Sequence, residues 1–154
     1  MNSSLLYLFK GLSAENMEKV MAIGKQVSMK KGRQIFKEGQ KADGVYILRS
    51  GAVELMTTVE KGFDLPISIL REPGDVFGTS ALVPPHRYSL SARCVEKGML
   101  FCMDTSALRK LAAENGNIGC QMMTNLATYF LDRLKETRQE VKIHFKTLLS
   151  STRS

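Results

Sequence analysis

Histidine and cysteine are scarce in this sequence, and the few copies are scattered. The histidines are His86 and His144, and no His-x-His pair lies on a predicted strand, so a metal site is not predicted. The cysteines, Cys94, Cys102 and Cys120, form no Cys-x-x-Cys pair, which argues against a disulfide framework or a zinc site. We interpret Cys94 and Cys102 as reduced thiols in the core of the protein.

The sequence also lacks the residue patterns of common catalytic and membrane-bound proteins. It contains no Ser/His/Asp or Cys/His arrangement and no Walker-type phosphate loop, so we expect a protein that is not an enzyme. No apolar run approaches the roughly 18 residues of a membrane-spanning helix. Residues 1–10 have neither the basic head nor the long apolar stretch of a signal peptide. We therefore expect a cytoplasmic protein with no membrane partner.

What the sequence does contain is typical of one folded domain. Its 154 residues are 44% hydrophobic and 24% charged, which is enough to bury a core. The net charge of +7 is spread along the chain, and near the C-terminus positive and negative residues alternate as on a solvated helix face. These alternating residues are Asp132, Arg133, Lys135, Glu136, Arg138 and Glu140. We interpret the positive residues as part of a solvated surface and not as a nucleic-acid-binding surface.

We expect this single domain, residues 1–154, to have three segments. They are N-terminal helices (1–24), a region of short strands (25–104) and C-terminal helices (105–150). Ser13 is the predicted N-cap of a helix over about 14–24. The middle region alternates apolar and polar residues between glycine-containing turns, which is typical of strands. Within it, Ser50-Gly51 is predicted to form a tight hairpin.

A long helix is predicted over about 117–149, after a short helix that Asp104 caps. Its apolar residues recur at spacings of three, four or seven and make one stripe. They are Ile118, Met122, Leu126, Phe130, Leu134, Val141, Phe145 and Leu148. We expect the first half of this stripe to pack on the strands. The second half has no surface of its own chain left to cover, so we expect a homodimer through this helix.

One stretch, residues 74–89, carries the features of an anion site. Glycines at 74 and 78 flank an apolar pair, and a run over 79–83 is long enough for one or two helical turns. Pro84-Pro85 must stop that run, because proline lacks an N–H and restricts the residue before it. Arg87 follows at the start of a strand-like segment. Backbone N–H groups at a helix start and a nearby guanidinium together favour a phosphate.

This stretch resembles the phosphate-binding cassette of cyclic nucleotide-binding domains, the effector domains of catabolite-activator and FNR-type regulators. The matching residues are Phe77, Gly78, Ala81, Leu82 and Arg87. The family glutamate that binds the ribose 2′-hydroxyl is replaced by Thr79, and Tyr88 stands where the family has a small residue, with Ser89 one position later. The glycines at 32, 39 and 51 also fit the corners of the β-roll of this family.

The resemblance implies a mainly β fold with flanking helices: a double-stranded β-helix (jelly roll or β-roll) with N-terminal helices and a long C-terminal helix. It implies a cyclic nucleotide, cAMP or cGMP, or another small anion as ligand, with Arg87 on the phosphate. The expected binding residues are Phe77, Gly78, Thr79, Ser80, Ala81, Arg87, Tyr88, Ser89, Thr128 and Tyr129. The long helix would close over the ligand and transmit binding to its twin or to a downstream protein partner.

Three further expectations follow from the resemblance. Residues 151–154 leave no room for the winged helix-turn-helix of the family's transcription factors, so we expect no DNA binding by this chain. One alternative function is an interaction or dimerisation module whose degenerate site is empty. The other is a sensor of haem, a gas or redox state on the same fold. Neither the ligand sensor nor the dimerisation module requires a cofactor.

Overall fold

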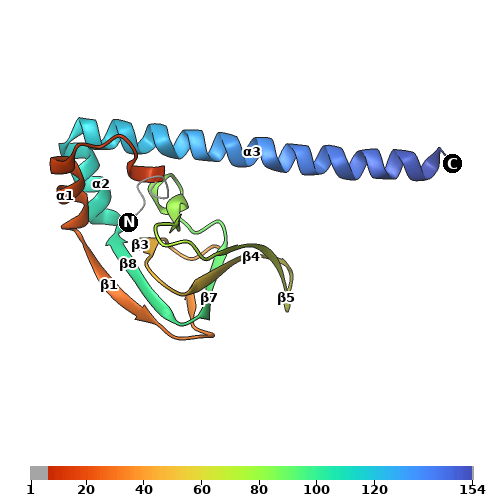
Figure 1. Ribbon diagram of the computed structural model, residues 1–154, viewed down its shortest axis with the longest axis horizontal. Helices are drawn as coiled ribbons and strands as arrows, with labels where there is room; N and C mark the ends of the chain where they lie inside the picture. The colour runs from red at the N-terminus through yellow and green to blue at the C-terminus, as the bar shows by residue number, and fades with distance from the viewer. Residues whose placement is uncertain (1–6, 154) are drawn as a thin grey trace.

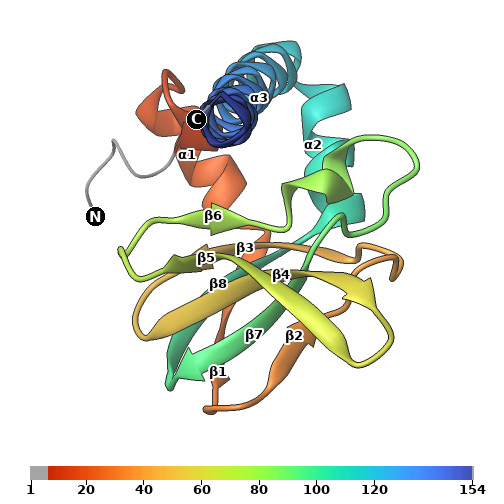
Figure 2. The ribbon, with the colours of Figure 1, turned by 90° about the vertical axis from the view of Figure 1, so that its right-hand side faces the viewer.

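The computed structural model describes residues 7–153 and consists of a β-roll with helices along one side (Figures 1 and 2). In chain order the elements are η2 (Tyr7–Phe9), α1 (Ala14–Met21), β1 (Gly24–Met29), β2 (Gln34–Phe36), β3 (Gly44–Leu48), β4 (Ala52–Glu60), β5 (Phe63–Leu70), β6 (Val76–Phe77), η3 (Thr79–Leu82), β7 (Ser91–Glu96), β8 (Gly98–Asp104), α2 (Thr105–Glu114) and α3 (Gly116–Thr152). The expected mainly β fold with flanking helices and a long C-terminal helix is confirmed.

The strands form two four-stranded sheets in the orders β1-β8-β3-β6 and β2-β7-β4-β5, with antiparallel pairing. The hairpin predicted at Ser50-Gly51 is therefore wrong, because β3 and β4 lie in different sheets. Gly51 instead makes a corner against the β7–β8 turn: its φ is 85°, and a Cβ there would lie 2.6 Å from the carbonyl oxygens of Glu96 and Lys97. The long hairpin of this fold joins β4 to β5.

The core contains residues from both sheets and from the helices. The strands contribute alternating side chains such as Val45, Ile47 and Met103, all fully buried. The N-terminal helices add Leu8 and Val20 to the same cluster. Both predicted caps are present: the Ser13 hydroxyl accepts from Asn16 N at 3.1 Å, and the Asp104 carboxylate accepts from Ala107 N at 2.9 Å.

Helix α3 has two parts with different surroundings. Its first turns bury Ile118, Met122 and Leu126 against the domain. The amide of Asn125 donates to the carbonyls of Leu8 and Lys10, at 3.0 and 2.8 Å, which holds η2 against the helix. Beyond these turns the helix extends away from the body, in the same direction as the β4–β5 hairpin (Figure 1). No helix within residues 7–153 has the length and apolar character needed to cross a membrane.

Candidate ligand pocket

The cassette is shaped by Gly78, which joins β6 to η3. Its φ of 78° is left-handed, and a Cβ at this position would lie 3.2 Å from the Tyr88 ring and 3.3 Å from the Gly44 carbonyl. Glycine is the residue that fits both conditions. The run predicted over 79–83 is a single 3-10 turn, Thr79–Leu82, and the Pro84–Pro85 bond that follows it is cis.

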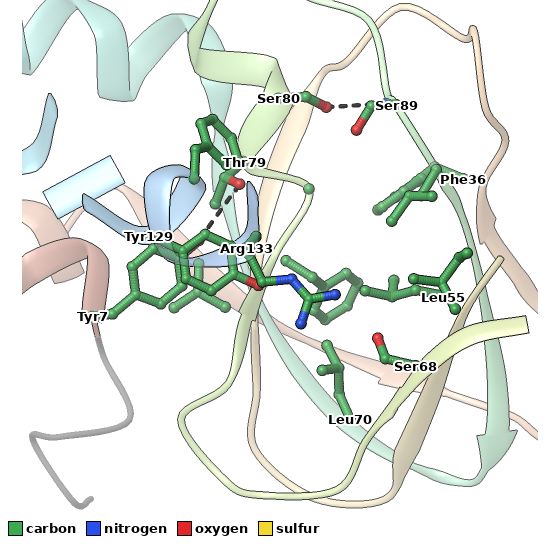
Figure 3. Close-up of a pocket in the computed structure, with 16 residues that line it drawn as sticks. Tyr7, Phe36, Leu55, Ser68, Leu70, Thr79, Ser80, Ser89, Tyr129 and Arg133 are labelled. Carbon is green, nitrogen blue, oxygen red and sulfur yellow. Dashed lines mark hydrogen bonds between the residues drawn. The ribbon is translucent and has the colours of Figure 1, made fainter. Parts of the chain in front are cut away.

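A cavity of about 190 Å³ lies between the cassette, the β4–β5 hairpin and α3 (Figure 3). Its lining residues are Tyr7, Phe36, Leu55, Ile67, Ser68, Leu70, Val76, Phe77, Gly78, Thr79, Ser80, Ser89, Leu90, Tyr129, Phe130 and Arg133. The predicted site residues that the structure brings together here are Phe77, Gly78, Thr79, Ser80, Ser89 and Tyr129. The cassette and the long helix therefore meet at one pocket.

Arg87 is not among the lining residues. Its side chain is exposed, and its Nη1 donates to the carbonyl of Gly39 at 2.8 Å. The next residue, Tyr88, is 4% exposed and points inward, stacked on Phe36 with 3.7 Å between ring centroids. Its phenol donates to the Gly44 carbonyl at 2.7 Å and accepts from Gly44 N at 3.0 Å. Because successive side chains of an extended chain point to opposite sides, an inward Tyr88 places Arg87 outward.

Two other predicted residues also lie apart from the cavity lining. Ala81 is fully buried and belongs to the core cluster. Thr128 is exposed on α3, and its hydroxyl donates to the carbonyl of Thr124 at 2.9 Å. Of the pair predicted on the long helix, Tyr129 alone lines the pocket.

Tyr7 and Tyr129 close one end of the pocket. Their rings stack at 4.1 Å with an interplanar angle of 12°, and the Tyr7 hydroxyl donates to the Thr79 hydroxyl at 3.5 Å (Figure 3). Burial raises the pKa of both phenols above the ordinary value, so both stay protonated at neutral pH. At the opposite edge the Ser80 hydroxyl accepts from Ser89 N at 3.1 Å.

Arg133 also lines the pocket, although it is not among the binding residues expected from the sequence. It follows Tyr129 by four residues, so both side chains lie on one face of α3. Figure 3 shows its guanidinium reaching from Tyr129 toward Leu55 and Ser68. Its Nη1 also donates to Glu136 at 2.9 Å, as the charge alternation suggested. Arg133 is exposed, as expected of a solvated helix face, and it also borders the pocket; its spacing from Tyr129 was the available signal for the second property.

Comparison with known proteins identifies the fold family. Residues 26–115 match the family model of the cyclic nucleotide-binding domain. The chain belongs to this family. The Anaerobic regulatory protein of Bacillus subtilis is 25% identical over 135 residues, which is 88% of this chain and 56% of that protein. The Cyclic AMP receptor protein of Thermus thermophilus is 29% identical over 140 residues, or 88% of this chain and 61% of that protein.

Solved structures of the family agree with this assignment. The Catabolite Activator Protein of Thermus thermophilus superposes with a TM-score of 0.75 at 26% identity, over 89% of this chain and 62% of that one. The sensor domain of the transcriptional regulator DNR from Pseudomonas aeruginosa shares the fold, with a TM-score of 0.68 at 23% identity over 84% of this chain and 87% of that domain. The chain spans about three fifths of the curated relatives it matches.

The family assignment fixes the class of function. Cyclic nucleotide-binding domains are ligand-binding modules of regulators and not enzymes, so the expected non-catalytic role is confirmed. The relatives include regulators named for cyclic AMP and regulators named for anaerobic growth and for fumarate and nitrate reduction. This chain accordingly has the fold of a regulatory sensor domain.

Proposed function

We propose that the protein senses a small anionic ligand in the pocket between the β-roll and α3, and that α3 transmits binding. The observation that carries this proposal is the shared lining: Thr79 and Ser80 belong to the cassette, whereas Tyr129 and Arg133 belong to α3. A ligand there contacts both parts at once. It therefore favours the position of α3 that completes its contacts, and the population of helix positions shifts.

Cyclic nucleotides are the first ligands to test, because the family model and the cassette backbone support them. Two side-chain positions weaken that match. Thr79 lacks the paired acceptors of a carboxylate, and Arg87 bonds the Gly39 carbonyl outside the pocket. The loss of one charged hydrogen-bonding group costs about 1.5–3 kcal/mol, or roughly ten- to a hundredfold in affinity. We expect cAMP and cGMP to bind more weakly than in a domain with both groups.

Calorimetric titration with cAMP and cGMP tests this site directly. Arg87→Ala and Arg133→Ala are the two informative variants, since both side chains are solvent-accessible and neither supports the core. Nucleotide binding that disappears with Arg87→Ala alone would mean that the cassette rearranges to use the family arginine. Binding that depends on Arg133 would place the anion at α3. Failure of nucleotides and of small organic anions alike would refute the sensor proposal.

We also propose that α3 forms a homodimer, because its distal part is apolar and uncovered. The exposed large apolar residues of this part are Phe130, Leu131, Leu134, Val141, Ile143, Phe145, Leu148 and Leu149. Leu134, Val141 and Leu148 recur every seven residues, the spacing of a coiled-coil seam. A stripe of this kind is stabilised by burial against a second helix.

The haem, gas or redox alternative has a simple test, the visible absorbance and thiol dependence of the purified protein. Nothing in the described structure favours it specifically. The cysteines lie apart, with Cys94 buried on β7, Cys102 half-buried on β8 and Cys120 exposed on α3. Within residues 7–153 no group of three His, Cys, Asp or Glu side chains is placed to hold a metal ion.

A further inference from the structure

We propose that the pocket takes a small amphipathic monocarboxylate, with its carboxylate on Arg133 and its hydrocarbon part against the apolar wall. This inference rests on the proposed sensor function of the same pocket and names the chemical class of its ligand. It is carried by the charge, the lining and the size of the cavity.

The charge of the lining selects one anionic group. Within residues 7–153, Arg133 is the one charged side chain that lines the cavity, and no carboxylate lines it. A guanidinium matches a carboxylate geometrically, because two parallel N–H groups meet its two oxygens. Arg133 therefore neutralises a ligand with one carboxylate. The second charge of a dianion, or the charge of a cation, has no opposite charge among the described lining residues.

The rest of the lining favours a hydrocarbon body. Its apolar members are Phe36, Leu55, Ile67, Leu70, Val76, Phe77, Leu90 and Phe130. The polar edge is already engaged in part, since Thr79 accepts from Tyr7 and Ser80 accepts from Ser89 N. A polar group of a ligand that faces these apolar side chains is left unpaired, and each unpaired polar group weakens binding. A short alkyl chain or a single aromatic ring has no such groups.

The size of the cavity agrees with a small ligand. Its volume of about 190 Å³ is below the roughly 300–1,000 Å³ of typical ligand pockets. Tyr7 and Tyr129 occupy one end of the cavity with their stacked rings, which reduces the space left for a ligand.

Arg133 is available to a ligand because its present partner holds it weakly. The Arg133 and Glu136 side chains are 46% and 61% exposed, and exposed ion pairs of this kind contribute little to stability. An arginine also has five N–H donors, so a ligand carboxylate can bind the pocket side while Glu136 keeps Nη1. Both residues lie on α3, so the incoming charge acts directly on the helix that transmits the signal.

The test is calorimetric titration of the full chain with phenylacetate and hexanoate, using the neutral isosteres phenylacetamide and hexanamide as controls. We expect the acids to bind and the amides not to bind detectably. Arg133→Gln should weaken acid binding by about ten- to a hundredfold. Lys135→Gln removes the same charge from an exposed position of α3 outside the lining and should leave acid binding unchanged.

Each outcome decides the proposal. Equal binding of acids and amides, or an unchanged affinity in Arg133→Gln, would overturn the carboxylate assignment. Binding of cAMP or cGMP without binding of either acid would also overturn it, while the sensor function of the pocket would stand. If neither nucleotides nor acids bind, both the ligand class and the sensor function are wrong. Unfolding curves of Arg133→Gln and Lys135→Gln confirm that both variants are folded.

Discussion

The loss of stability in Leu126→Ala should be the same at every protein concentration, whereas the loss in Leu134→Ala should depend on protein concentration. Leu126 is 1% exposed, and removal of a buried leucine side chain costs about 2–5 kcal/mol. With a urea m-value of about 2 kcal/mol/M, the midpoint of Leu126→Ala should fall by about 1–2.5 M at every protein concentration. Leu134 is 52% exposed in the single chain, so Leu134→Ala should cost at most about 0.5 kcal/mol in the monomer.

The dimer proposal changes the expected loss of stability in Leu134→Ala. If the exposed half of Leu134 is buried against a second α3, each chain loses about 0.8–1.5 kcal/mol of burial in Leu134→Ala, and the loss appears when the dimer is populated. Urea unfolding followed by circular dichroism at about 1 μM and about 100 μM protein separates the cases. A wild-type midpoint that does not depend on protein concentration, together with a monomeric wild-type mass by light scattering, would refute the dimer. Equal effects of the two substitutions at both concentrations would refute the division of α3 into two parts.

Two more predictions test the fold and the closed end of the pocket. Gly51→Ala should destabilise the protein more than Gly62→Ala in urea unfolding. Both glycines have φ near 85°, but a Cβ at 51 would meet backbone oxygens, and a Cβ at 62 would lie within 4 Å of no described residue other than its chain neighbours. Similar losses would contradict the tight corner. Burial raises the pKa of Tyr7 above that of an unfolded tyrosine, so the folded state binds more protons and stability should fall as pH rises above about 10. Tyr7→Phe should reduce that fall; an unchanged pH profile would contradict the assignment.

The architecture was predictable from the sequence because its signals are local. Apolar and polar residues alternate in the strands, whereas apolar residues recur with a helical period in α2 and α3. Side-chain caps mark helix starts at Ser13 and Asp104. The long helix expected over about 117–149 runs from Gly116 to Thr152. The turn at Gly51 shows the limit of such signals. Its left-handed φ indicates a corner. The sheet to which the next strand, β4, belongs depends on its pairing with β5 and β7.

The direction of single side chains was harder to predict than the pocket itself. Arg87 is near the cassette in sequence, yet the choice between Arg87 and Tyr88 as the inward residue depends on packing against Phe36 and Gly44, which come from other strands. Arg133 is far from the cassette in sequence, and its charge pattern is that of a solvated face. It lines the pocket because the buried first turns of α3 fix the rotation of the whole helix.

The rotation of α3 links the two proposed properties of the protein. Arg133 faces the pocket, and the adjacent Leu134 begins the seam that continues through Val141 and Leu148. A ligand that draws Arg133 toward the cassette must also turn or shift the seam, since a helix moves as a rigid element over a few turns. Ligand binding and dimerisation are then coupled, and by linkage dimerisation changes ligand affinity by the same factor. The affinity of the pocket should therefore depend on protein concentration in the wild type and lose that dependence in Leu134→Ala.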